Sequence, residues 1–435
     1  MFLKYFGLLS VCAASAYGWM PGFGLPRTDF NNINFQVQSA AVPGLANAYG
    51  VTLIPSSGTD VLRAVQGAAN QWSSSSIPST AIHFGTVIYS ANQTVANDGV
   101  SLLVMQDTAA NRSFLGCSDS GTSVSCWAAG ITIYNSRQDS DIILAPDRTW
   151  DETNISRVVR HELGHLLGAG HSGIYMATMW PMSSNRITSD DIAFATATYP
   201  ASGAKVGSIQ GKLLYSDTGS PQYGLVTASG RLNNVVVGAL VQADGSFTIS
   251  GIPQGEYIVT TQPLGYYITP GTVGLSSADM YQVGCYGGCI QNPLELPVRA
   301  DQATMGANIV VKRGSPTFQF SVIGVTTGDS HSNTFYTQTF ADRLLTAGAD
   351  RALLLFINDT ATGTPRRLMG KVWSSSLDQL CPIYYDTGVT RSGRHPYRTP
   401  VTVRRPVTGW PTVIVVDEQT HEAAVADGWF YIPGN

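Results

Sequence analysis

The sequence from residue 161 to residue 171 reads HELGHLLGAGH and places histidines at His161, His165 and His171. On an α-helix, His161 and His165 lie on one face, about 40° apart around the axis. Two imidazole nitrogens on one face can bind one Zn²⁺ ion. Gly168 can adopt a positive φ and end the helix, so that the chain turns and His171 returns as a third ligand. This pattern predicts a helix from Ile155 to Leu167 that carries a metal site.

The same stretch contains an acidic residue suited to catalysis. Three protein ligands leave a coordination position for water, which a catalytic zinc site requires. Glu162 is rotated about 100° from His161, so it lies beside the metal and need not bind it. We hypothesise that Glu162 is the general base that takes a proton from the activated water and the general acid that gives it to the leaving amine.

A packing role and a structural metal site both explain these histidines less well than a catalytic metal site does. A lone histidine on a helix is usually a packed or surface residue, but here three of the chain's 7 histidines fall in one short window. A structural zinc site usually closes with a fourth side chain, often cysteine. No cysteine lies between Cys126 and Cys285, so the pattern favours a catalytic site.

The quoted residues match the H-E-x-x-H-x-x-G-x-x-H signature of the metzincin peptidases. The chain resembles the matrixins in particular, the family of the matrix metalloproteinases. Ser172 follows the third histidine, as in matrixins, and Met179-Trp180-Pro181-Met182 resembles the family's Met-turn, with Met179 beneath the metal. Thr188 to Ile192 resembles the start of the last helix of the catalytic domain. The resemblance covers about residues 27–200 and implies a zincin-type domain, a twisted sheet plus three helices, that hydrolyses peptide bonds with zinc.

The resemblance also has consequences for substrate and metals. By analogy, Trp127 to Tyr134 is the edge strand that pairs with an extended substrate, a mode that reads main chain and tolerates many side chains. Trp180 and Ser183 stand where the family often has tyrosine, so no P1′ preference carries over. The family's structural zinc ligands are not found. Asp139 and Asp141 are oxygen donors of the kind that calcium accepts, but we expect two acids in a loop to be solvated instead.

The periodicity of the chain predicts the elements around this site. An amphipathic helix is expected at Thr59–Trp72, and Thr188–Thr198 is expected to form a helix with a capping box from Thr188 to Asp191. Short strands are expected at Phe30–Gln38, Val100–Met105, Ile131–Tyr134 and Asp141–Leu144. These helical and strand patterns predict that residues 27–200 form one α/β unit.

The sequence changes character after Pro200, where Ala201 to Ala204 form a plausible linker. Residues 205–313 contain strands and turns, and Asp244-Gly245 between two of these strands is a hairpin signal. This region resembles a carboxypeptidase regulatory-like domain, a prealbumin-like β-sandwich. The residues that carry the resemblance are Gly207 to Gly211, Asp244 to Phe247 and Gly251 to Tyr257. Residues 314–435 are expected to form a C-terminal β-rich domain of unknown role, of which an immunoglobulin-like sandwich is one possible form.

The N-terminus and the cysteines indicate export. Residues 1–16 resemble a signal peptide, with Lys4 followed by a short apolar stretch and a small-x-small cleavage site at Ala14 to Ala16. The chain has 6 cysteines. In an oxidising compartment, Cys117 is expected to pair with Cys126 and Cys285 with Cys289, whereas Cys381 has no evident partner.

The composition excludes some functions. The net charge of −4 and the lack of a basic block argue against nucleic-acid binding. No segment is apolar enough for a membrane span. The sequence therefore predicts an α+β multidomain protein, secreted or on the cell surface. Its zinc endopeptidase domain would act on protein or peptide substrates and would be followed by β-sandwich domains. The alternatives are a surface adhesion or binding protein with a vestigial peptidase domain, and a metal-dependent hydrolase acting on a non-protein substrate.

Overall fold

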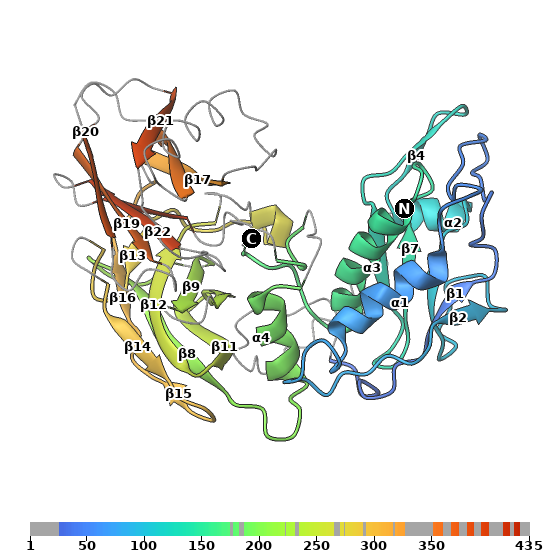
Figure 1. The fold of residues 1–435 in the computed structure, drawn as a ribbon, viewed down its shortest axis with the longest axis horizontal. Helices are drawn as coiled ribbons and strands as arrows, with labels where there is room; N and C mark the ends of the chain where they lie inside the picture. Colours follow the sequence, from blue (N-terminus) through green and yellow to red (C-terminus); the bar gives the residue numbers. More distant parts are fainter. Residues whose placement is uncertain are drawn as a thin grey trace.

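The computed structural model describes residues 26–315, except 175–176, 182–186, 222, 231–234, 265–269, 274 and 290–292. Beyond them it describes Glu422 and strands between 318 and 426. The predicted signal peptide, as well as Met182 and Ser183, lies outside the described residues. The sheets and helices together form an α+β multidomain structure (Figure 1). None of the helices described reaches the length and apolarity that crossing a bilayer requires.

The N-terminal unit contains a five-stranded sheet in the order β2-β1-β3-β7-β6. Its strands are β1 (Phe35–Gln38), β2 (Ile88–Ser90), β3 (Ser101–Val104), β6 (Gly130–Tyr134) and β7 (Ser140–Leu144). Four strands run parallel, and β6 pairs antiparallel with β7. Within the described residues β6 is therefore an edge strand, in the position that the sequence predicted.

Two long helices pack together against this sheet (Figure 1). Helix α1 (Val61–Trp72) buries the apolar residues that recur at helical spacing, and the Asp60 side chain caps its first turn. Helix α3 (Glu152–Leu166) begins after Asp151, whose carboxylate accepts a hydrogen bond from the Asn154 N–H at 2.7 Å. It ends before Gly168, which adopts a φ of 97° as predicted. The Trp72 indole N–H donates to the Arg160 carbonyl at 2.8 Å and joins the two helices.

Two local predictions in this unit were incomplete. The strand expected from Phe30 begins only at Phe35, because a turn in which the Asn32 N–H donates to the Asp29 carbonyl at 2.8 Å precedes it. The short helix α2 (Ala109–Phe114) was not predicted. Asn111 is its only buried residue, so it presents no apolar stripe to the core.

Residues 206–311 form two facing sheets around one apolar core. One sheet has the order β10-β9-β12-β13, with β14 beside β12, and the other has the order β11-β8-β15, with β16 beside β8. The strands are β8 (Val206–Tyr215), β9 (Leu225–Gly230), β10 (Val236–Leu240), β11 (Ser246–Pro253), β12 (Gly255–Gln262), β13 (Gly284–Cys285), β14 (Glu295–Val298), β15 (Ala303–Thr304) and β16 (Ile309–Val311). We call this unit the β-sandwich. A 3₁₀ helix covers Pro270–Val273.

The hairpin predicted at Asp244-Gly245 is wrong. A tight turn does form there, since the Gly245 N–H donates to the Gln242 carbonyl at 2.9 Å. However, β10 pairs with β9 and β11 pairs with β8, so the turn connects strands of opposite sheets. A turn motif fixes only the local reversal, whereas burial of Phe247 and Val237 in the shared core decides the pairing.

Beyond residue 315 the structure describes backbone strands in two antiparallel sheets, ordered β17-β18-β21 and β20-β19-β22-β23. Their bounds are Phe318–Thr326 (β17), Arg351–Asp359 (β18), Arg367–Trp373 (β19), Cys381–Asp386 (β20), Gly393–Thr399 (β21), Thr412–Asp417 (β22) and Ala423–Ala426 (β23). These strands agree with the β-rich composition. The pairing of Cys381 lies outside what is described.

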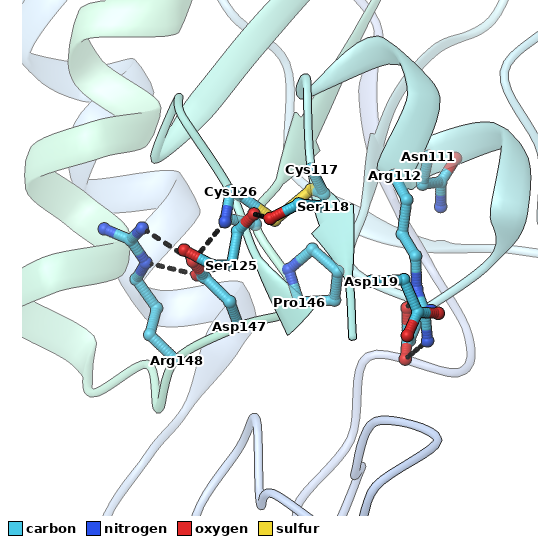
Figure 2. Close-up of a disulfide and its surroundings, with 12 residues drawn as sticks. Asn111, Arg112, Cys117, Ser118, Asp119, Ser125, Cys126, Pro146, Asp147 and Arg148 are labelled. Atoms are coloured by element: carbon cyan, nitrogen blue, oxygen red, sulfur yellow. Dashed lines mark hydrogen bonds and ion pairs between the residues drawn. A yellow bond between two sulfur atoms is a disulfide. The ribbon is translucent and has the colours of Figure 1, made fainter. Parts of the chain in front are cut away.

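Both predicted disulfides are present, Cys117–Cys126 and Cys285–Cys289. Figure 2 shows Cys117–Cys126 closing the small hairpin of β4 (Ser118–Asp119) and β5 (Val124–Ser125). The Cys126 N–H donates to Asp147 at 2.7 Å, and Asp147 also pairs with Arg148. The disulfide thus fixes the chain shortly before edge strand β6.

Replacing both Cys117 and Cys126 by alanine is expected to lower the free energy of unfolding by about 2–3 kcal/mol, because the open loop gains entropy in the unfolded chain. Urea unfolding of the oxidised protein and the variant measures this difference. Adding a reductant should bring the wild-type protein towards the variant. Equal midpoints for the oxidised protein and the variant would contradict the expectation.

Candidate metal centre and catalytic site

The three predicted ligands converge. One ligand atom from each of His161, His165 and His171 lies within 4.8 Å of the other two. The ring centroids are 4.7 Å apart for His161 and His165, 4.9 Å for His165 and His171, and 5.4 Å for His161 and His171. Within the described residues, this is the one group of three or more metal-binding side chains.

Backbone carbonyls orient two of the rings. His161 Nδ1 lies 2.7 Å from the Thr178 carbonyl oxygen, and His165 Nδ1 lies 2.8 Å from that of Ala169. Since a carbonyl only accepts, each Nδ1 carries the hydrogen, and each Nε2 keeps a free lone pair. This is the usual arrangement of metal-binding histidines, whose other nitrogen donates to a carbonyl or carboxylate.

Burial also keeps these imidazoles neutral. Desolvation lowers the pKa of His161 to about 4 and lowers that of His165 well below its usual value. Metal binding requires the neutral imidazole, so no protons have to be released near pH 7. The donor set of three imidazoles, of which His161 and His165 are neutral and already oriented, fits a zinc ion.

The side chain of Glu162, a residue of helix α3, faces edge strand β6. It is buried, and desolvation raises its pKa to about 7, an effect that a hydrogen bond from Thr132 partly offsets. The Thr132 Oγ1 lies 2.8 Å from Glu162 Oε2 and 2.9 Å from the Glu162 carbonyl oxygen. The edge strand thus holds the carboxylate in a fixed orientation.

Gly130 makes this close approach possible. A Cβ atom at this position would lie 2.8 Å from Val158 Cγ1 and 3.1 Å from Glu162 Oε1. Gly130 and Thr132 are two apart on β6 and therefore face the same side, towards helix α3. Their proximity to Glu162 was not predicted from the sequence, because it depends on how the strand and the helix pack.

Replacing Thr132 by valine is expected to lower kcat for peptide hydrolysis about 10-fold, the effect of losing one hydrogen bond of roughly 1.4 kcal/mol to the base. Zinc content should not change, since the hydroxyl bonds to Glu162 and not to a histidine ligand. Thr132→Ser retains the hydroxyl and should keep most of the activity. Steady-state kinetics of the three proteins test this, and a fully active Thr132→Val protein would refute it.

The segment predicted as a Met-turn packs against the turn of α3 between the candidate ligands His161 and His165. Met179 is buried, and a Cβ atom at Gly164 would lie 2.1 Å from its Sδ. Asp191 holds this segment by accepting hydrogen bonds from the N–H groups of Thr178 at 2.8 Å and Met179 at 3.1 Å.

Asp191 also connects the segment to helix α4 (Ser189–Thr198). Its carboxylate accepts a hydrogen bond from the Thr188 N–H at 2.8 Å, as the predicted capping box requires. The His161 ring donates to the Thr178 carbonyl, which lies between the N–H groups of Thr178 and Met179. By holding these two N–H groups, Asp191 also fixes the carbonyl that orients His161.

The expectation that Asp139 and Asp141 are solvated is wrong. Both are buried, and backbone N–H groups occupy their oxygens. Asp139 accepts from Asp98 and Gly99 at 2.8 and 2.7 Å, and Asp141 accepts from Ala96 and Leu102 at 3.0 and 2.9 Å. They therefore order the surrounding loop.

Comparison with known families agrees with this geometry. Residues 56–200 match the family model described as Matrixin. The match covers the three histidines, Glu162 and helix α4, and it supports a matrixin-like domain in this part of the chain. It extends over less than half of the 435 residues. None of the curated proteins matches the chain at a significant level.

Several solved structures show weak likeness. The Bacillus anthracis TIE protein is 11% identical, with a TM-score of 0.17, and the match covers 52% of this chain and 31% of that one. A DUF3823 family protein from Bacteroides ovatus is 11% identical, with a TM-score of 0.19, and the match covers 51% and 96%. A putative carbohydrate binding protein from Bacteroides uniformis is 6% identical, with a TM-score of 0.17 and coverage of 52% and 99%. TM-scores this low do not establish a common fold.

Proposed function

We propose that this chain is a secreted or cell-surface zinc-dependent endopeptidase whose zincin-type catalytic domain spans about residues 27–200. The observation that carries the proposal is the convergence of His161, His165 and His171 beside the buried carboxylate of Glu162. The match of residues 56–200 to the matrixins supports the reaction class. Two disulfides fit an oxidising compartment outside the cytoplasm.

The three histidines would hold the metal, His161 and His165 through Nε2 and His171 through a ring nitrogen. When bound, zinc supplies a Lewis acid that makes water more acidic and polarises the scissile carbonyl. Glu162 then acts as general base towards the attacking water and as general acid towards the leaving amine. A pKa near neutrality suits this double role, because the group can both accept and return a proton at working pH.

Strand β6 offers a binding surface for an extended peptide. It is the last strand of its sheet within the described residues, so its outer main-chain groups can pair with substrate. Thr132 on this strand bonds to Glu162, and Gly130 leaves no room for a Cβ beside it, so a paired peptide's main chain would lie close to the base. Main-chain pairing of this kind suits the cleavage of varied protein substrates.

The test begins with the purified full chain, whose zinc content is measured by elemental analysis and whose activity is assayed on unfolded casein or gelatin. We expect one zinc per chain and hydrolysis that a chelator abolishes and added zinc restores. A chain that binds no zinc would refute the proposal. Zinc present without hydrolysis of any unfolded protein would favour an adhesion or binding protein with a vestigial peptidase domain.

A further inference from the structure

The third ligand is held differently from the other two. His161 and His165 belong to helix α3, which fixes their backbone, whereas His171 follows the end of that helix at Leu166. The backbone of His171 continues directly into Ser172, which is buried. The Ser172 N–H donates to the Met179 carbonyl at 2.8 Å, and its hydroxyl accepts from the Ile174 N–H at 2.9 Å.

The strongest anchor of Ser172 is a carboxylate. The Ser172 hydroxyl donates to Asp190 Oδ2 at 2.6 Å, and both residues are buried. The other oxygen, Asp190 Oδ1, accepts a hydrogen bond from the Gly238 N–H at 2.8 Å. Gly238 belongs to strand β10 of the β-sandwich, so a continuous path connects that unit to the residue beside the third ligand.

Strand β10 is suited to this contact because, among the described strands, it lies at the edge of its sheet. An edge strand has main-chain groups that need partners. The first turn of α4 supplies them: the Ser189 hydroxyl donates to the Val236 carbonyl at 2.8 Å and accepts from the Val236 N–H at 2.9 Å. Together with the Asp190 contact, these bonds fix α4 against the β-sandwich, and Figure 1 shows α4 between the two units.

Apolar packing makes this docking tight. Side chains from both units form one buried cluster: Ile174, Ala177, Leu225, Val236, Leu240 and Leu264. A Cβ atom at Gly173 would lie 2.6 Å from Leu225 Cδ1, and one at Gly238 would lie 2.9 Å from Ile174. Gly251, with a φ of +72°, approaches the Ala193 carbonyl so closely that a Cβ would lie 2.1 Å away. The interface therefore resembles a domain interior rather than a loose tether.

We propose that the β-sandwich is a structural part of the metal centre: strand β10 holds Asp190, and Asp190 positions His171 through Ser172. Asp190 is thus a positioning residue, not a catalytic one. This inference rests on the proposed function, because it assumes that the three histidines bind zinc. Loss of groups that orient a ligand typically lowers metal affinity about 10–100-fold, and we expect an effect of this size here.

The first experiment measures zinc affinity of the full chain by competition with a chromogenic chelator. We expect Asp190→Ala and Ser172→Ala to bind zinc at least about 10-fold more weakly than the wild-type protein. Asp190→Asn keeps the shape and can still bond to both neighbours, so it should remain within about threefold. Ser189→Ala is the matched control: it weakens the same docking contact on β10 but has no bond to Ser172, and its zinc affinity should not change.

The second experiment tests the contribution of β10. Gly238→Ala and Gly238→Pro both add a Cβ atom against Ile174, but only proline removes the N–H that bonds to Asp190. We expect zinc affinity to fall about 10-fold further in Gly238→Pro than in Gly238→Ala. Absorption spectra of the Co²⁺-substituted proteins report the ligand geometry directly. They should change in Gly238→Pro, Asp190→Ala and Ser172→Ala, but not in Ser189→Ala.

The outcomes separate this inference from the proposed function. A wild-type protein that binds no zinc refutes the proposed function. Wild-type zinc affinity in folded Asp190→Ala or Ser172→Ala, checked by circular dichroism, overturns the positioning role. Equal losses in Ser189→Ala and Asp190→Ala would also overturn it, because docking alone would then explain the effect. Equal affinities for the two Gly238 variants would remove β10 from the path.

Discussion

Glu162→Gln is expected to retain zinc and to lose peptide hydrolysis about 10²–10⁴-fold in kcat. Glutamine has nearly the same shape and can still accept a hydrogen bond from Thr132 Oγ1, which lies 2.8 Å from Glu162 Oε2 in the wild-type protein. It cannot take a proton at neutral pH, so neither the attack of water nor the departure of the amine is assisted. Single-turnover cleavage of a quenched peptide, together with metal analysis of the same sample, measures both quantities.

Glu152→Gln is the matched control for this variant. Glu152 lies at the start of the same helix α3, where it pairs with Arg63 instead of facing the metal centre. This substitution should leave kcat and zinc content near those of the wild-type protein. A Glu162→Gln protein with zinc bound and undiminished turnover would exclude Glu162 as the base.

His161→Ala is expected to abolish stoichiometric zinc binding and hydrolysis together. Two remaining imidazoles do not complete the three-ligand set of a catalytic zinc site. In the wild-type protein, zinc at 100 times its Kd should raise the free energy of unfolding by about 2.7 kcal/mol. Thermal unfolding with and without zinc should show this increase in the wild-type protein but not in the variant.

The quantity to compare is the zinc-dependent increase in the free energy of unfolding, because loss of the buried His161 ring also lowers the stability of the metal-free protein. His83→Ala is the control, since His83 is exposed and lies outside the metal centre. It should keep the full zinc-dependent increase. A similar increase in His161→Ala would show that zinc binds elsewhere, and the assignment of the metal centre would be wrong.

Features that depend on neighbours in sequence were predictable. Helices α1 and α3 follow from residue spacing and from Gly168, because a helix is held by contacts a few residues apart. The two disulfides were predictable for the same reason, since each closes a short loop. His161 and His165 share one helical face, so their proximity follows from the period alone.

Features that depend on distant contacts were not predictable. The Asp244-Gly245 turn was recognised, but its strands pair in opposite sheets. Asp139 and Asp141 were expected in water, yet the loop of Ala96 to Gly99 folds over them and supplies N–H groups. In both cases the deciding partner lies far away in the sequence, and no local pattern specifies it.

The sequence by itself determined which residues make up the candidate site: three histidines and a glutamate at fixed spacing, with a glycine that ends the helix. Only the tertiary structure decided how that site is supported. It placed Thr132 and Gly130 of the edge strand against Glu162, and it placed Gly238 of the β-sandwich against Asp190. The physical reason is the sequence separation of the interactions. The helical period acts over a few residues, whereas the packing of strand, helix and β-sandwich requires surfaces far apart in the sequence to be buried together.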